Sequence, residues 1–273
     1  MNFVEEITSP ANASIKLARA LDMKKTRRET GLFVAEGARH VQEGLDHAWH
    51  LETLIFAPSA ESRDYVGDLI RRAGAAGARL LRAPDRILEQ IGRRDNAQNV
   101  VGLFRQRLAP LASLTPQNAD IWIALERPKD PGNLGTILRT ADSVGAGGVI
   151  LIEESCDPFS SEAVRASMGS VFAVPIARAT FDEMNAWRQS GGAKLVGTAL
   201  FGSTPHHETN YGSPCVLLMG NEQSGISRAM GQACDALVRL PMAGTADSLN
   251  LAIATAVTAY EIWRQNGFRG ARS

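Results

Sequence analysis

The sequence predicts an α/β protein with two parts, a small N-terminal α/β domain and a larger C-terminal domain built on a parallel sheet. Short apolar stretches typical of strands alternate with amphipathic stretches typical of helices along the whole chain. Several apolar stretches are continuous, such as Val216-Leu217-Leu218-Met219, as expected for parallel strands buried on both faces. A segment rich in Pro, Ser and Thr separates the two parts.

The first part, residues 1–108, alternates helices and strands. Apolar runs predict strands at 32–35, 51–57, 79–82 and 100–105, and Pro58 closes the second of them. Helices are predicted at 11–22, 23–28, 38–45, 59–73 and after Pro84. Residues 109–117 lack periodicity and are predicted to be a linker.

The second part, residues 118–273, continues the alternation. Strands are predicted at 120–125, 148–152, 194–199, 215–219 and 236–240. Helices are predicted at 133–145, 161–168, 180–189, 226–231 and 248–265. In such sheets, ligands bind beyond the carboxyl ends of the strands, so the loops that follow three of these strands are the best candidates for a site.

Composition excludes several classes of protein. With 44% hydrophobic and 21% charged residues, the chain is neither disordered nor collagenous nor a coiled coil. Lys plus Arg (29) equals Asp plus Glu (29), with a small basic excess in the front half. Cys156, Cys215 and Cys234 have no C-x-x-C spacing, which argues against disulfides and against a metal site. The acidic N-terminus and the lack of an apolar run of about 18 residues predict a cytoplasmic protein without membrane spans.

The first candidate loop joins the strand at 120–125 to a helix. Asn133 is expected to cap this helix. Leu134, Ile137 and Leu138 belong to one apolar stripe. Arg139 points nearly opposite that stripe, so it is either an ordinary solvated arginine or a functional group.

The second candidate loop, 220–225, follows the buried strand at 215–219. Gly220 and Gly225 would let backbone amides approach a ligand closely. The loop is neither a P-loop nor a G-x-G-x-x-G motif, which disfavours nucleoside triphosphates and dinucleotides. Glu222 either complements a helix dipole or belongs to a site.

The third candidate loop, 241–247, leads into the last helix, with Asp247 or Ser248 expected as the N-cap. Asn250 could be a polar residue of the first turns, and Met242 could be core filler. Each loop has such an ordinary structural explanation, but three of them in one domain predict a composite pocket.

Together these loops resemble the three motifs of the SpoU (TrmH) family of RNA ribose 2′-O-methyltransferases, within the SPOUT superfamily. The matching stretches are Asn133-Leu-Gly-Thr-Ile-Leu-Arg139, Leu218-Met-Gly-Asn-Glu222-Gln-Ser-Gly225 and Leu240-Pro-Met-Ala-Gly-Thr-Ala-Asp-Ser248-Leu-Asn250. The first part resembles the family's RNA-binding domain, which is related to small ribosomal proteins. The matching stretches there are Phe33-Val-Ala-Glu36-Gly37 and Gln98-Asn-Val-Val-Gly102, with Asn99 where the family has glycine.

The resemblance implies a Rossmann-like sheet with a deep trefoil knot, S-adenosylmethionine as cofactor, and a homodimer. The cofactor contacts that it implies are Thr198, Gly220, Leu240, Met242 and Leu249. The catalytic set that it implies is Asn133, Arg139, Glu222, Ser248 and Asn250. The implied substrate is structured RNA, and a separate RNA-binding domain favours ribosomal over transfer RNA.

Methyl transfer to a ribose hydroxyl requires in-line geometry and a way to remove or mask the hydroxyl proton. Arg139 stays protonated, so it suits stabilisation of the developing alkoxide or binding of a neighbouring phosphate. Glu222 is then either a base or a carboxylate that orients Arg139 or Asn133, and the residues do not decide between these roles. RNA affinity is expected from basic residues of the first domain: Lys24, Lys25, Arg27, Arg28, Arg93 and Arg94.

Three other functions remain to be distinguished. A SPOUT enzyme that methylates a guanine nitrogen would normally have a different, acidic motif in place of the pattern from Asn133 to Arg139. A catalytically silent RNA-binding or ribosome-assembly factor could keep the same fold. A nucleotide-dependent oxidoreductase is disfavoured because the glycine fingerprint is missing.

Overall fold

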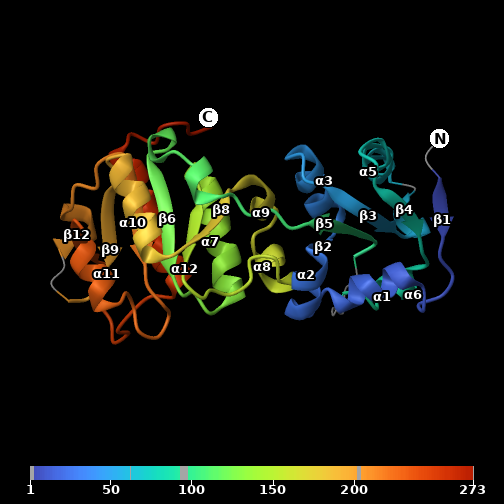
Figure 1. Cartoon of the computed structure of the whole chain (residues 1–273), viewed down its shortest axis with the longest axis horizontal. Helices are drawn as coiled ribbons and strands as arrows, with labels where there is room; N and C mark the ends of the chain where they lie inside the picture. The colour runs from blue at the N-terminus through green and yellow to red at the C-terminus, as the bar shows by residue number, and fades with distance from the viewer. Residues whose placement is uncertain (1–2, 62, 93–97, 202–203, 273) are drawn as a thin grey trace. The chain divides into compact units, whose positions relative to one another are not determined.

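The chain forms two compact units in the computed structural model, which describes residues 3–61, 63–92, 98–201 and 204–272. The first unit comprises Met1–Arg107 together with Asp157–Ala173, and the second comprises Leu108–Cys156 together with Val174–Ser273 (Figure 1). The segment Asp157–Ala173 therefore belongs with the first unit, although its position in the sequence predicts that it lies in the second. Among the described residues we find no helix with both the length and the apolar character needed to cross a bilayer.

The first unit is built on a mixed sheet with strand order β1-β4-β3-β5-β2. Its strands are β1 (Val4–Glu6), β2 (Leu32–Glu36), β3 (Leu51–Phe56), β4 (Arg79–Arg82) and β5 (Val100–Arg105). Its helices are α1 (Ala13–Ala20), α2 (Lys24–Thr30), α3 (Ala38–Asp46), α4 (Pro58–Glu61), α5 (Asp64–Ala75), α6 (Asp85–Leu88), α8 (Ser161–Ala166) and α9 (Ser170–Ala173). β5 is antiparallel to both of its neighbours, whereas β1, β4 and β3 run parallel.

The inserted segment Asp157–Ala173 completes the core of the first unit. Phe159 and Phe172 pack against Phe33 and Trp49 with ring centroids 5.0 to 6.1 Å apart. The indole N–H of Trp49 donates a 2.9 Å hydrogen bond to the carbonyl oxygen of Phe172. Because a buried aromatic ring removes about 150–250 Å² from water, Phe159 and Phe172 add to the apolar burial of the first unit, beside a second core cluster formed by residues 7–103 alone.

The second unit is built on a sheet that is parallel throughout, as the sequence predicts, with strand order β10-β12-β9-β11-β6-β7-β8. Its strands are β6 (Ile121–Glu126), β7 (Val149–Ile152), β8 (Ile176–Ala179), β9 (Lys194–Thr198), β10 (Thr204–Pro205), β11 (Cys215–Met219) and β12 (Ala236–Arg239). Its helices are α7 (Pro131–Ser143), α10 (Phe181–Ser190), α11 (Arg228–Ala233) and α12 (Leu251–Gln265).

Helices cover both faces of this sheet (Figure 1). On one face, Met184 and Trp187 of α10 and Met230 of α11 join a core with alternate residues of the strands, such as Trp122 and Val216. On the other face lie α7 and α12, which contact each other. Burial on both faces explains why the central strands are continuous apolar runs.

Residues 109–117, which the sequence predicts to be a linker, pack as part of the second unit. They contain the 3₁₀ turn Leu111–Ser113 and lead into a second turn, Pro116–Asn118. The indole N–H of Trp187 donates to the carbonyl oxygen of Leu114 at 2.7 Å, and that of Trp122 donates to the carbonyl oxygen of Pro116 at 2.9 Å. These side-chain hydrogen bonds, with the backbone hydrogen bond from Ala109 to Ile176, hold the segment on the second unit although it forms no long helix or strand.

Candidate active site

The loop between β6 and α7 ends in a helix cap that differs from the one the sequence predicts. Asp130, not Asn133, is the N-cap of α7, and its Oδ1 accepts a 2.6 Å hydrogen bond from the backbone N–H of Asn133. Pro131 occupies the first helical position, where a missing N–H costs nothing. The prediction for Asn133 is therefore wrong, and the consequence is that its side-chain amide is free to reach other loops.

The Asn133 amide links two of the candidate loops. Its Nδ2 lies 3.3 Å from Oε1 of Glu222, and its Oδ1 accepts a 2.9 Å hydrogen bond from Nδ2 of Asn250. Asn250 is the N-cap of α12, where its Oδ1 accepts from the backbone N–H of Ala252, so the expected capping by Asp247 or Ser248 is wrong. Three of the five predicted catalytic residues thus form one hydrogen-bonded chain, Glu222–Asn133–Asn250.

Glu222 holds the start of α7 in place. Its Oε2 accepts from the backbone N–H of Lys129 at 3.1 Å, and its Oε1 accepts from that of Asp130 at 3.2 Å. Partial burial raises the pKa of Glu222, but hydrogen bonds from its own backbone, Lys129, Asp130 and Asn133 outweigh burial and hold that pKa below the ordinary value. A carboxylate whose two oxygens already accept hydrogen bonds and whose pKa is lowered is a poor proton acceptor, but it holds the loop and the start of α7 in position.

The Gly220 loop folds back on itself. A Cβ on Gly220 would lie 2.0 Å from the carbonyl carbon of Gly225 and 2.1 Å from the backbone nitrogen of Ile226. Across this close approach, the backbones of Asn221 and Gly225 exchange hydrogen bonds of 3.0 and 2.9 Å. The glycine at 220 is therefore required by the loop itself, whereas the sequence suggests only an approach of backbone to ligand.

Two further residues, which the sequence analysis missed, fix these loops to β6. Nδ2 of Asn221 donates to the carbonyl oxygen of Arg127 at 2.8 Å. The buried Glu126, 4% exposed, accepts a 2.8 Å hydrogen bond at Oε2 from the backbone N–H of Ser227. An acidic residue at the end of the otherwise apolar strand 121–125 is the sequence pattern that could have identified Glu126.

The other two predicted catalytic residues lie outside the hydrogen-bonded chain. Arg139 is exposed on α7, and within the described parts of the chain no hydrogen bond or ion pair of its guanidinium is found. Ser248 lies in the segment 241–250, every residue of which is exposed. Both side chains are therefore accessible to a bound molecule.

The predicted cofactor contacts follow neighbouring strands. β12, β9 and β11 are adjacent and parallel, so the residues after them share one edge of the sheet. Thr198 ends β9, and its Oγ1 lies 3.5 Å from Sδ of Met219. Leu240 follows β12 and is half-buried, while Met242 and Leu249 are each 37% exposed. This edge therefore offers apolar side chains to a ligand.

The predicted RNA-binding residues of the first unit divide into three groups. Lys24, Lys25 and Arg28 are exposed and line a shallow hollow on α2. The prediction for Arg27 is contradicted, because this side chain is 4% exposed and its Nε donates to Oδ2 of Asp157 at 2.8 Å, while its Nη1 donates to two backbone carbonyls. Arg93 and Arg94 lie outside the described residues.

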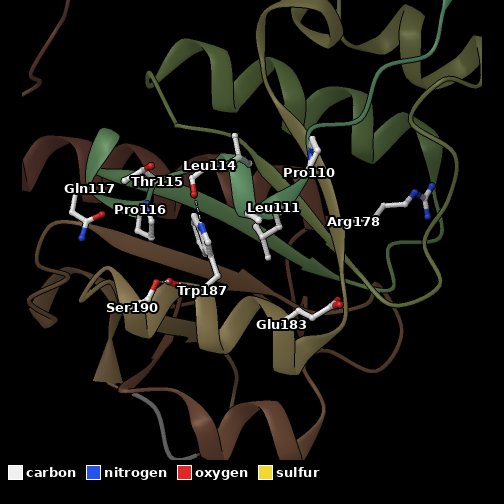
Figure 2. A pocket seen from close by; sticks show the side chains of 11 residues that line it. Pro110, Leu111, Leu114, Thr115, Pro116, Gln117, Arg178, Glu183, Trp187 and Ser190 are labelled. Atoms are coloured by element: carbon white, nitrogen blue, oxygen red, sulfur yellow. Dashed lines mark hydrogen bonds between the residues drawn. The ribbon is translucent and has the colours of Figure 1, made fainter.

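A pocket of about 630 Å³ lies within the second unit, between the segment 110–117 and α10 (Figure 2). Leu111, Pro116 and Trp187 supply apolar walls, and Arg178 and Glu183 also line it. No residue of the predicted site contributes to it. In the described part of the chain, no group of three or more His, Cys, Asp or Glu side chains could hold a metal ion.

Comparison with known proteins connects both units to RNA methylation. The model of the SpoU rRNA Methylase family matches residues 120–260, and that of the MRM3-like substrate binding domain matches residues 12–102. The 23S rRNA (uridine(2479)-2′-O)-methyltransferase of Streptomyces viridochromogenes is 31% identical over 90% of this chain and 87% of its own. A 23S rRNA (guanosine(2553)-2′-O)-methyltransferase of Bacillus subtilis is 27% identical over 95% and 99%. The AdoMet-bound rRNA methyltransferase from Sinorhizobium meliloti is 46% identical over 96% and 98%, with a TM-score of 0.89.

Proposed function

Because the chain belongs to the SpoU rRNA methylase family, we propose that it transfers a methyl group from S-adenosylmethionine to a ribose 2′-hydroxyl of 23S rRNA. The observation that carries the proposal is the hydrogen-bonded chain Glu222–Asn133–Asn250, which joins the three motif loops at one edge of the sheet. The two 23S rRNA relatives modify different nucleotides, so the identity of the nucleotide does not follow from them.

S-adenosylmethionine, when bound, supplies an electrophilic methyl group. The proposed contacts are Thr198, Gly220, Leu240, Met242 and Leu249. The exposed apolar surface of Met242 and Leu249 fits an adenosyl group, since ligand sites combine apolar walls with a few polar groups. Two solved relatives that contain AdoMet support this choice of cofactor.

In the proposed reaction, Glu222 acts as an orienting carboxylate rather than as a base. Through the backbone of Lys129 and Asp130 it holds the start of α7 and, with it, Asn133. The guanidinium of Arg139 is exposed, so it would stabilise negative charge on the attacking ribose oxygen while the hydroxyl proton passes to solvent water. Ser248 and Asn250 position the ribose from the opposite loop.

The proposal divides RNA binding and catalysis between residues 1–108 and 118–273. Lys24, Lys25 and Arg28 bind RNA phosphates in the first domain, and Arg93 and Arg94 are proposed to assist them. Arg27 is left out because it is buried against Asp157. Family membership supports this division, since the matched MRM3-like model describes a substrate binding domain.

We also propose a homodimer that covers the outer face of α12. Ile253, Val257 and Tyr260 lie along this face and are 53%, 39% and 45% exposed, an apolar stripe that a second copy would bury. Val257→Glu should therefore convert a dimer into a monomer in light-scattering measurements. If the wild-type chain scatters as a monomer, the dimer is refuted.

The proposal includes a deep trefoil knot in the chain from β9 to α12. Its support is the strand order, in which β12 lies on the far side of β9 from β11, together with the family membership.

Mass mapping of ribose methylation in RNA from a deletion strain tests the proposed reaction. We expect one 2′-O-methyl group to be missing from 23S rRNA and to return on expression of the wild-type chain but not of Arg139→Ala. Loss of a methyl group from transfer RNA alone would reassign the substrate. An unchanged methylation pattern would indicate a catalytically silent RNA-binding or assembly factor.

A further inference from the structure

Arg127, the residue after β6, has an unusual backbone conformation. Its φ is +48°, in the left-handed region that favours glycine. Its backbone N–H donates to the carbonyl oxygen of Ile152 at 3.1 Å, and its carbonyl oxygen accepts from Nδ2 of Asn221 at 2.8 Å. Hydrogen bonds at both the N–H and the carbonyl oxygen therefore fix the backbone of Arg127, and with it the direction in which its side chain leaves the sheet.

The guanidinium of Arg127 is not used by the fold. Arg127 is exposed, and over residues 3–61, 63–92, 98–201 and 204–272 no hydrogen bond or ion pair of its side chain is found. A glycine would satisfy the backbone at this position with less strain. An arginine that adopts a glycine conformation and whose guanidinium forms no hydrogen bond or ion pair with the described residues points to a role for the side chain outside the fold.

A second cation lies on the same loop. Lys129 is exposed and also makes no described side-chain contact, while its backbone N–H is held by Oε2 of Glu222. Glu222 and Asp130, the carboxylates that contact this loop and the start of α7, accept hydrogen bonds from backbone N–H groups. Two cations that have no ion pair among the described residues thus extend from a fixed backbone at the edge of the site that holds Asn133.

We propose that Arg127 and Lys129 bind the backbone phosphates beside the target ribose, as an RNA contact within the second unit. This inference rests on the proposed function, because it needs an RNA ribose at the Asn133 edge. A ribose in a chain carries a phosphate on either side, and arginine binds phosphate in a bidentate manner. Recognition of this kind fixes the register of the RNA without selecting a base.

The backbone of Arg127 provides a discriminating test, Arg127→Gly. Glycine adopts the left-handed conformation of residue 127 without the strain that arginine has there, so the thermal midpoint should stay constant or rise. The affinity for an unmodified 23S rRNA transcript should fall about tenfold, the effect of losing one charge-assisted contact. The slope of log K against log salt concentration should become shallower by about one. Affinity for S-adenosylmethionine should not change.

Glu153→Gly is the control for RNA binding, although it also removes a 3.4 Å hydrogen bond from the backbone N–H of Phe181 to Oε1 of Glu153. Glu153 follows β7, also has a left-handed backbone with φ of +59°, and is exposed. The control removes the same kind of backbone strain but no cation, so it should not weaken RNA binding. Lys129 does not have a left-handed backbone, so Lys129→Ala removes a cation without a change in backbone strain. It should again reduce the salt slope by about one.

The outcomes separate the inference from the function on which it rests. If Arg127→Gly and Lys129→Ala keep the wild-type salt slope while the wild-type chain binds RNA and transfers methyl groups, the inference is overturned and the function stands. A fall in the thermal midpoint of Arg127→Gly below that of the wild type would assign Arg127 to the fold and also overturn the inference. A wild-type chain that binds neither the transcript nor S-adenosylmethionine would refute the proposed function itself.

Discussion

Replacement of Gly220 by alanine tests whether this glycine serves the loop or only a ligand. The new Cβ would lie 2.0 Å from the carbonyl carbon of Gly225. The backbone at residue 220 and the backbone at residues 225–226 must therefore move apart by about 1–1.5 Å to restore normal contact. That movement breaks the two hydrogen bonds between Asn221 and Gly225. Each bond contributes about 1 kcal/mol and overpacking costs about 2 kcal/mol more, so we expect a loss of about 4 kcal/mol.

Urea unfolding followed by circular dichroism measures this loss, and Gly225→Ala is the control. Gly225 has a φ of +65°, but a Cβ there would meet no heavy atom within 4 Å. Its replacement should therefore cost only the left-handed conformation, about 1–2 kcal/mol. Titration calorimetry with S-adenosylmethionine on both variants then shows whether affinity falls together with loop stability.

The reasoning fails if Gly220→Ala unfolds within about 1 kcal/mol of the wild type while it loses cofactor affinity, since the glycine would then serve the ligand alone. It also fails if the two alanine variants are destabilised equally, because only Gly220 faces a backbone contact.

Three other predictions follow from the described contacts. Arg27→Ala breaks a buried ion pair with Asp157 and should cost about 3–5 kcal/mol in urea unfolding, whereas exposed Lys24→Ala should change stability by less than about 0.5 kcal/mol. Arg139→Ala should keep its stability within about 0.5 kcal/mol and lower kcat by roughly 10² in single-turnover methyl transfer; near wild-type turnover would make Arg139 an ordinary surface residue. Because the pKa of Glu222 is lowered in the fold, its carboxylate stabilises the protein above its unfolded pKa of about 4.3, and this contribution is lost as the pH falls through the folded value. Urea midpoints of Glu222→Gln should therefore lie below the wild type at pH 7 and converge with it in acid, and a pH-independent gap would contradict the assignment.

Most strands were predictable because their apolar runs are local. The predicted ranges 79–82 and 100–105 agree with β4 and β5, and the parallel sheet of the second unit is confirmed. β1 was missed because Val-Glu-Glu has no strand pattern of its own and becomes a strand only by pairing with β4. The short strands β8 and β10 were missed for the same reason, since their neighbours define them.

The candidate site was predictable as a set of motifs but not as a geometry. Resemblance selected Asn133, Glu222 and Asn250, yet no pattern in the sequence could show that Asp130 takes the cap and frees the Asn133 amide. Arg27 was misassigned because the run from Lys24 to Thr30 contains no apolar residue that would mark its inward face. The contact that buries Arg27 comes from Asp157, far along the chain, and local periodicity carries no information about it.

The insertion of Asp157–Ala173 into the first unit affects the order in which the chain can fold during synthesis. Phe159 and Phe172 leave the ribosome only after β6, α7 and β7 of the second unit have been made. At about 5–20 residues per second, the nascent first unit must wait on the order of seconds with Phe33 and Trp49 uncovered. The core cluster of residues 7–103 can form during this interval, but the aromatic cluster around Phe33 and Trp49 is completed only after residue 173 has emerged.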